Sequence, residues 1–193
     1  MTRLSTIEFE HWRPDMAERT KASNRMGIIA NSLKTYAHQP GMAAAMSGLT
    51  TEVFYNGTVD PHLKVLIRTI TSQANGCRYC STHQFAAIHR TGVPEAKTAE
   101  LWSFESSPAF SEAERAALRF TLKLTTDHQG LSDADFDDMK RHWSEPEILE
   151  IMLTSLVMGF YNKLNDSLGL PIDDSLADFG PVALEHRLPT LTR

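Results

Sequence analysis

The chain has 193 residues, of which 41% are hydrophobic and 22% charged, and its formal net charge is -5. A chain of this length can bury its own core without cross-links, so we expect a single domain over residues 1–193. The acidic balance argues against nucleic acid as a partner, and no apolar run approaches the roughly 18 residues that cross a bilayer. Because the N-terminus also lacks the apolar segment of a signal peptide, we expect a soluble cytoplasmic protein with no membrane partner.

Helical periodicity dominates the chain and no segment alternates as a strand, so the predicted fold class is all-α. Apolar residues recur at helical spacing over residues 15–38, which predicts one helix that Pro40-Gly41 ends. A segment rich in methionine and alanine follows to about Phe54. We expect its Met42 and Met46 to pack in the core rather than in a substrate pocket.

Two central helices are predicted on either side of Asn75-Gly76. The first begins where Asp60 precedes Pro61, a pair typical of an N-cap followed by the first helical residue. The second begins at the two cysteines and ends at Gly92, which suits a helix C-terminus.

Three later helix starts show a serine followed three residues on by an acid, the pattern of a capping box. The pairs are Ser111 with Glu114, Ser132 with Asp135, and Ser144 with Glu147. The last of these helices, from Pro146 to about Leu168, is the most apolar. Its wide apolar face predicts burial on more than one side, by the core or by another subunit. Residues 172–193 show no clear period, and we interpret them as an arm laid on a neighbouring subunit rather than a disordered end.

The only two cysteines, Cys77 and Cys80, form a CxxC motif at the predicted start of the second central helix. Residues 61–94 contain no acid around them. Nearby cations and a helix N-terminus both favour the thiolate, the reactive form of cysteine. Two sulfurs on one helical turn can close a disulfide, so one can attack and the other resolve. The pattern therefore indicates redox chemistry. The cations of this stretch are Lys64, Arg68, Arg78 and Arg90.

His83, three residues after Cys80, lies about 60° around the helix from it, close enough for acid–base contact. The alternative is a surface histidine on a basic helix. Gln84 lies between the two sulfurs in projection, and with Arg78 it is a candidate binding residue. A zinc site would need His89 as well, but that residue points away from the cysteine face. We therefore expect no metal and no other cofactor.

Leu63 to His83, above all the segment Asn75-Gly-Cys-Arg-Tyr-Cys80, resembles the alkylhydroperoxidase D-like (AhpD-like) proteins of the carboxymuconolactone decarboxylase family. Residues 106–120 and 142–171 are similar to the linker and closing helix of that family, so the resemblance covers about residues 27–171. It implies an all-helical AhpD-like fold with the CxxC at the start of a central helix. It also implies a homo-oligomer, a trimer or hexamer, and a thiol peroxidase that is regenerated by an external dithiol or disulfide reductase.

By the same resemblance, Cys80 would attack the peroxide and Cys77 would resolve, while a glutamate and a histidine move the proton. The family glutamate falls at Val65, and the family histidine falls at Gln84, one residue after His83. Because no nearby carboxylate can replace the glutamate, the cations and the helix dipole would have to stabilise the thiolate. Peroxide turnover would then be weak.

The function that we expect is the reduction of organic hydroperoxides through a dithiol that becomes a disulfide. Two alternatives remain open at this point. One is a non-redox enzyme of the carboxymuconolactone decarboxylase type, which needs no cysteines. The other is a non-catalytic oligomeric redox sensor, which oxidises once and does not cycle with a reductant.

Overall fold

The structure is a computed structural model that describes residues 2–23 and 27–179. Within these ranges the secondary structure is helical and contains no strand, which confirms the predicted all-α class. No helix in them is long and apolar enough to cross a membrane. The α-helices are α1 (Pro14–Ser23), α2 (Asn31–Tyr36), α3 (Pro40–Tyr55), α4 (Pro61–Ala74), α5 (Arg78–Thr91), α6 (Glu95–Ala99), α7 (Glu112–Thr126), α8 (Asp133–Lys140) and α9 (Glu145–Leu168). Short 3-10 segments are η1 (Phe9–His11), η2 (Leu101–Ser103), η3 (His128–Gly130) and η4 (Asp174–Phe179).

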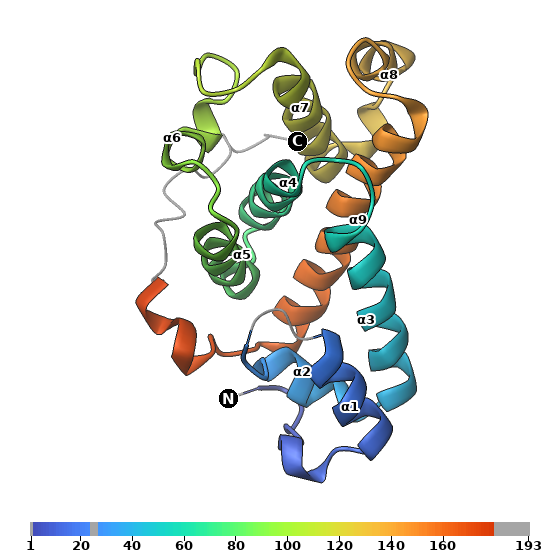
Figure 1. Cartoon of the computed structure of the whole chain (residues 1–193), viewed down its shortest axis with the longest axis vertical. Helices are drawn as coiled ribbons and strands as arrows, with labels where there is room; N and C mark the ends of the chain where they lie inside the picture. The colour runs from blue at the N-terminus through green and yellow to red at the C-terminus, as the bar shows by residue number, and fades with distance from the viewer. Residues whose placement is uncertain (1, 24–26, 180–193) are drawn as a thin grey trace.

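Helices α4 and α5 lie side by side at the centre of the molecule, and α4 also packs against α7 and α9 (Figure 1). Leu66, Ile67 and Ile70 of α4 have no exposed surface. Full burial of such a side chain stabilises the fold by roughly 1.5–3 kcal/mol. Helix α4 is therefore a firmly held support for the helix that carries the cysteines.

The predicted boundaries of α4 and α5 are confirmed. The Asp60 carboxylate accepts hydrogen bonds from the amides of His62 (2.7 Å) and Leu63 (3.2 Å), as an N-cap does. Gly76 and Gly92 both have a φ near +70° (72° and 71°), a conformation that suits glycine and ends helices. The turn at Gly76 therefore fixes where α5 begins.

The capping boxes predicted before α7, α8 and α9 are present. In each the acid accepts a hydrogen bond from the amide of its serine, and before α7 the Ser111 hydroxyl also accepts from the Glu114 amide. In the weaker Asp-based example, hydrogen bonds from Lys123 and Ser132 hold the pKa of Asp135 down at about 2. These helix starts were predictable because a capping box is formed by residues close together in the chain.

The prediction of one helix over residues 15–38 is wrong. Helix α1 ends at Ser23, α2 begins at Asn31, and Gly27 between them has a φ of 71°, which does not fit an α-helix. The backbone amide of Asn31 donates to Asp173 Oδ1 at 2.7 Å, so a distant carboxylate holds the start of α2. The apolar periodicity continues across this break and therefore could not reveal it.

The expectation that both methionines of α3 pack in the core is also wrong. Met42 is 65% exposed, whereas Met46 lines a cavity. The segment has too many small residues for its apolar face to be read reliably from the sequence.

Helix α9 has one buried and one exposed apolar face. Ile148, Ile151 and Met158 belong to the core, which confirms the prediction of core burial on one side. The other face is not covered by the described part of this chain. It carries a row of exposed side chains at helical spacing, Leu149 (55%), Leu153 (37%), Leu156 (48%) and Phe160 (48%).

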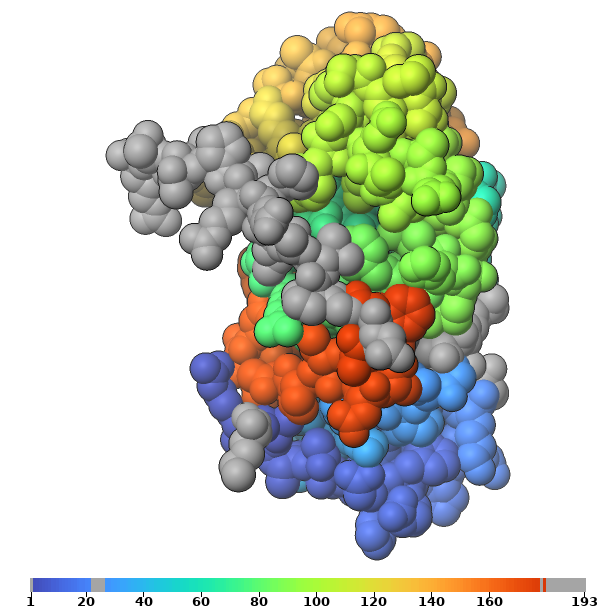
Figure 2. All heavy atoms as spheres, turned by 90° about the vertical axis from the view of Figure 1, so that its left-hand side faces the viewer, coloured from blue at the N-terminus to red at the C-terminus, as the bar shows by residue number. Residues whose placement is uncertain are grey.

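After α9 the chain folds back over its own surface. Figure 2 shows this segment in red between the N-terminal helices in blue and the green helices that include α5. Segment η4 packs against α5, and the rings of Phe179 and His89 lie 5.3 Å apart. Residues 172–179 thus pack against their own chain, and the arm on a neighbouring subunit stays a prediction, while residues 180–193 lie outside the described residues.

Candidate functional site

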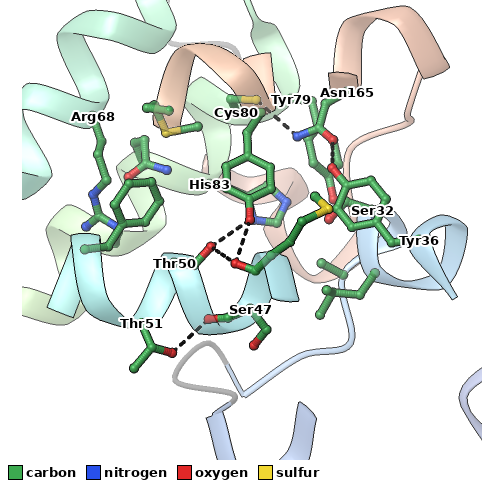
Figure 3. Close-up of a pocket in the computed structure, with 18 of the residues that line it drawn as sticks. Ser32, Tyr36, Ser47, Thr50, Thr51, Arg68, Tyr79, Cys80, His83 and Asn165 are labelled. Atoms are coloured by element: carbon green, nitrogen blue, oxygen red, sulfur yellow. Dashed lines mark hydrogen bonds between the residues drawn. The ribbon is translucent and has the colours of Figure 1, made fainter. Parts of the chain in front are cut away.

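A cavity of about 200 Å³ lies among α2, α3, α5 and α9 (Figure 3). Met46, Phe54 and Tyr161 give it an apolar, partly aromatic wall. Cys80 and His83 of α5 line the same cavity. A hollow with apolar walls and a few polar groups is typical of a site for a small molecule.

The two cysteines are free thiols, and both are buried, with exposures of 0% for Cys77 and 2% for Cys80. Only Cys80 is among the residues that line the cavity. Cys77 is the N-cap of α5, and its Sγ accepts a hydrogen bond from the Cys80 amide at 3.3 Å. A molecule in the cavity therefore meets Cys80, with Cys77 one helical turn behind it.

The environment separates the acidities of the two thiols. A hydrogen bond from Cys77 lowers the pKa of Cys80, burial opposes it, and hydrogen bonds from Asn165 and Asn162 lower it further. The shared bond with Cys80 and burial both raise the pKa of Cys77. Cys80 is therefore the more acidic thiol of the pair, and Cys77 is the less acidic one.

The stabilisation of the Cys80 thiolate comes from neutral hydrogen-bond donors and not, as predicted, from the cations of the acid-free stretch. Lys64 forms an ion pair with Glu150 of α9 and donates to the Val53 carbonyl at 3.0 Å. Arg78 is exposed and is not among the residues that line the cavity. The stretch free of acids in the sequence is thus not free of acids in space.

Asn165 of α9 directs a donor at the thiol: its Nδ2 lies 3.4 Å from Cys80 Sγ. The Tyr36 hydroxyl donates to Asn165 Oδ1, which leaves the amide nitrogen facing the sulfur (Figure 3). One turn earlier, Asn162 Nδ2 donates to Ser72 Oγ at 3.2 Å and so ties α9 to α4. Sequence reasoning missed both asparagines, although two amides three residues apart on a largely apolar helix were a usable signal.

His83 is buried and paired with a carboxylate, so the alternative of a surface histidine is wrong. Its Nε2 lies 2.8 Å from Asp173 Oδ2, and the Tyr79 hydroxyl donates to the same oxygen at 2.9 Å. Asp173 Oδ1 accepts from the Asn31 amide. The sequence offers no carboxylate close to the cysteines along the chain, but Asp173 reaches the histidine from 90 positions away.

Asp173 is held in its ionised form. Burial raises its pKa, but hydrogen bonds from His83, from the Asn31 amide and from Tyr79 outweigh burial, so the pKa is below its ordinary value. A carboxylate in this position fixes the orientation of an imidazole ring and stabilises its protonated form. Asp173 therefore holds the His83 ring in place at the cavity.

Gln84, the other candidate binding residue, lines the cavity and is 7% exposed. Its Oε1 has no hydrogen-bond partner among the described residues. No group of three His, Cys, Asp or Glu side chains that could hold a metal occurs within residues 2–23 and 27–179.

The model of the carboxymuconolactone decarboxylase family matches residues 40–123, a range that includes α3, α4 and α5. No curated protein matches the chain.

Among solved structures, the chain is similar to the apo debrominase Bmp8, with 29% identity over 86% of this chain and 90% of that chain and a TM-score of 0.78. A cysteine-to-alanine variant of Bmp8 in complex with 2,3,4-tribromopyrrole shares 26% identity over 93% and 97% of the two chains, with a TM-score of 0.79. A peroxidase-related protein from Ralstonia eutropha JMP134 with an alkylhydroperoxidase AhpD core is 20% identical over 91% and 94%, with a TM-score of 0.79. This last likeness shows the fold.

Proposed function

We propose that this chain, which matches the carboxymuconolactone decarboxylase family model over residues 40–123, is an AhpD-like thiol-dependent peroxidase that reduces organic hydroperoxides at Cys80. One observation carries the proposal. The thiol with the lowered pKa lines the cavity, and the thiol with the raised pKa sits one helical turn behind it. That is the arrangement that an attacking and a resolving cysteine require.

In the first step the Cys80 thiolate attacks the outer oxygen of the hydroperoxide. The O–O bond breaks, Cys80 becomes a sulfenic acid, and the alkoxide takes a proton and leaves as the alcohol. His83 lines the same cavity and is backed by the ionised Asp173, so it is the proposed source of that proton.

In the second step Cys77 attacks the sulfur of the sulfenic acid. An S–S bond forms and water leaves, so one hydroperoxide has become one alcohol and one water while the dithiol has become a disulfide. An external dithiol or disulfide reductase returns the pair to the reduced form by exchange.

Reductive dehalogenation of an aromatic ring is a second candidate, favoured by the similarity to the debrominase Bmp8. Tyr36, Phe54 and Tyr161 line the cavity and would suit a flat ring. The Cys80 thiolate would attack the halogen, and the carbanion that leaves would take a proton. Cys77 would then displace halide to form the same disulfide, so atoms and electrons balance as in the peroxidase reaction.

We also propose that the chain forms a homo-oligomer. The exposed row of α9 that begins at Leu149 and ends at Phe160 gives a second copy an apolar surface to cover. A hydroperoxide and an external reductant would complete the set of partners.

A single-turnover experiment tests the function. Reduced protein is mixed with one equivalent of cumene hydroperoxide or of a polybrominated pyrrole, and free thiols, alcohol and bromide are counted. Peroxidase activity predicts rapid loss of both thiols with one alcohol formed, whereas dehalogenation predicts thiol loss only with bromide release. Two surviving thiols in both mixtures would refute both redox functions and favour a non-redox enzyme.

A sensor is separated from an enzyme by repeating the experiment with excess dithiothreitol and excess substrate. An enzyme forms many alcohols per chain, and a sensor forms one.

A further inference from the structure

Arg68 places a buried cation in the wall of the cavity. It comes from α4, is 4% exposed and lines the cavity. Its guanidinium lies 4.7 Å from the ring centre of Phe54 and 5.7 Å from that of Tyr55, and its Nε donates to the Lys64 carbonyl at 3.3 Å. Figure 3 places Arg68 on the opposite side of the cavity from Asn165. The cavity thus has a cationic end and a thiol end.

No carboxylate of the described residues lies within ion-pair distance of Arg68. Glu150, the acid that α9 brings to α4, is occupied by Lys64 and by the amides of Thr58 and Val59. A buried guanidinium stays charged, and a buried charge without a counter-ion is unfavourable. Stacking on two rings offsets only part of that cost.

A second arginine increases the positive potential. Arg90 of α5 also lines the cavity, although it is exposed. Burial lowers the pKa of Arg68 most, the neighbouring Tyr55 opposes this, and the charge of Arg90 lowers the pKa again. A negative charge placed between the two arginines would offset the free-energy cost of burying the Arg68 charge and the repulsion between Arg68 and Arg90.

Gln84 supplies an independent sign that the cavity binds a polar ligand group. Its buried amide lines the cavity, and its Oε1 accepts no hydrogen bond from the described residues. Since the two ends of an amide are assigned from their partners, the side chain can equally present its NH2 group to an acceptor. A ligand with oxygen acceptors would satisfy Gln84 and Arg68 together.

We propose that the substrate carries an anionic group, a carboxylate, which pairs with Arg68 while the reactive atom faces Cys80. The inference rests on the proposed function for the identity of that reactive atom. The planar guanidinium matches a carboxylate with two parallel hydrogen bonds, and the apolar walls formed by Met46, Phe54 and Tyr161 accept a ring-sized body. The substrate class is therefore a small carboxylic acid with an apolar body and an electrophilic O–O or C–halogen group.

Binding without chemistry tests this inference. Cys80→Ser protein is titrated by calorimetry with 4-isopropylbenzoate and with its methyl ester, which share a body and contain no reducible bond. We expect the carboxylate to bind at least about 30-fold more tightly than the ester, the lower end of what a buried charge pair contributes. The acid, and not the ester, should also raise the melting temperature.

Substitutions then locate the cation. Arg68→Met should reduce the preference for the acid to about three-fold or less, and Arg68→Lys should keep part of it, because the charge stays but the paired donors are lost. Arg78→Met is the matched control, since it removes the same charge from an exposed position outside the cavity wall and should leave the preference intact.

Equal binding of acid and ester to the Cys80→Ser protein would overturn the inference, and so would a full preference in Arg68→Met. Circular dichroism checks each fold. If Arg68→Met does not fold, the inference is tested by the ratio of acid to ester affinity in the Cys80→Ser protein, compared with the same ratio after Arg68→Lys. Because the two ligands contain no reducible bond, the binding measurements do not depend on peroxidase activity. The proposed function and the proposed carboxylate site can therefore fail independently.

Discussion

Two regions assemble the site, and they carry different parts of its chemistry. Residues 77–84 supply both thiols, the histidine and the buried amide from a single stretch of chain. Residues 162–173 supply the groups that tune them, with Asn165 located 85 positions from the thiol it faces and Asp173 located 90 positions from His83. Reactive groups are thus local in this chain, and the remote region adds donors and a carboxylate to the hydrogen bond that the two cysteines already share.

This division has a simple physical origin. Side chains of one helix point outward from its axis, so the helix can align two sulfurs but cannot surround them with donors. Beyond the bonds that the two cysteines make with each other, side-chain donors to those sulfurs come from another element. In this fold α9 and the segment after it lie against α5 and supply such groups. Variants in the two regions should therefore differ in kind: local ones abolish chemistry, and remote ones shift its rate and pH dependence.

The largest effect is expected within the local region. Cys80→Ser should abolish peroxide-dependent thiol loss, because the thiol that faces the cavity is gone. Cys77→Ser should still form one sulfenic acid at Cys80, detectable by a sulfenate-specific probe and mass spectrometry, but should not cycle. If Cys77→Ser is instead the inert variant, the assigned roles are reversed.

Asp173→Asn should give the next largest effect and is the strongest test of the remote region. It keeps the shape of the side chain but removes the negative charge that holds the His83 ring, so we expect the peroxide-reduction rate to fall about ten-fold or more. Single-turnover kinetics measure it. His83→Ala should lower the peroxide-reduction rate by about the same factor. The double variant should lower it no further than either single variant, because the two residues act as a unit.

The pH dependence of stability gives Asp173 a second, independent test. Its folded pKa is below the ordinary value of 3.8, so the stability that it contributes is complete above the unfolded pKa and is lost as pH falls through the folded pKa. Asp173→Asn should therefore destabilise the fold near neutral pH and flatten the acid limb of the unfolding curve below about pH 4. Urea titrations across that range measure it, and parallel acid limbs in both proteins would contradict the ion pair.

A smaller effect is expected at Asn165. Asn165→Leu removes a neutral donor from the thiolate, so the pKa of Cys80 should rise by up to about one unit, the equivalent of one hydrogen bond. Asn165→Asp should raise it further, since a like charge then faces the sulfur. The ultraviolet absorbance of the thiolate, followed against pH, measures both. An unchanged pKa in Asn165→Leu would mean that the hydrogen bonds from Cys77 and Asn162 are sufficient to lower the pKa of Cys80.

The same division explains what could be predicted from the sequence. The N-cap at Asp60, the turn at Gly76 and the capping boxes depend on residues a few positions apart, so they were correct. The acid-free stretch around the cysteines was misleading because Glu150 and Asp173 reach it from far along the chain. The break at Gly27 was missed for a similar reason, since the start of α2 is held by Asp173 rather than by its own neighbours.

The smallest effect on chemistry is expected for substitutions on the exposed face of α9, which contributes no residue to the site. Leu153→Glu places a charge in the exposed apolar row, so it should weaken association and shift the mass measured by light scattering towards a single chain. Gln129→Glu, which adds the same negative charge at an exposed position in η3, serves as the control for net charge.

The single-turnover rate of Leu153→Glu should stay within about two-fold of the parent rate, an effect on the scale of ordinary surface substitutions. The thiols, Asn165, His83 and Asp173 all come from one chain, so the redox step needs no second copy. If dissociation instead abolished thiol loss, the site would be incomplete in one chain, and the division into local and remote regions would need a third contributor from the neighbouring copy.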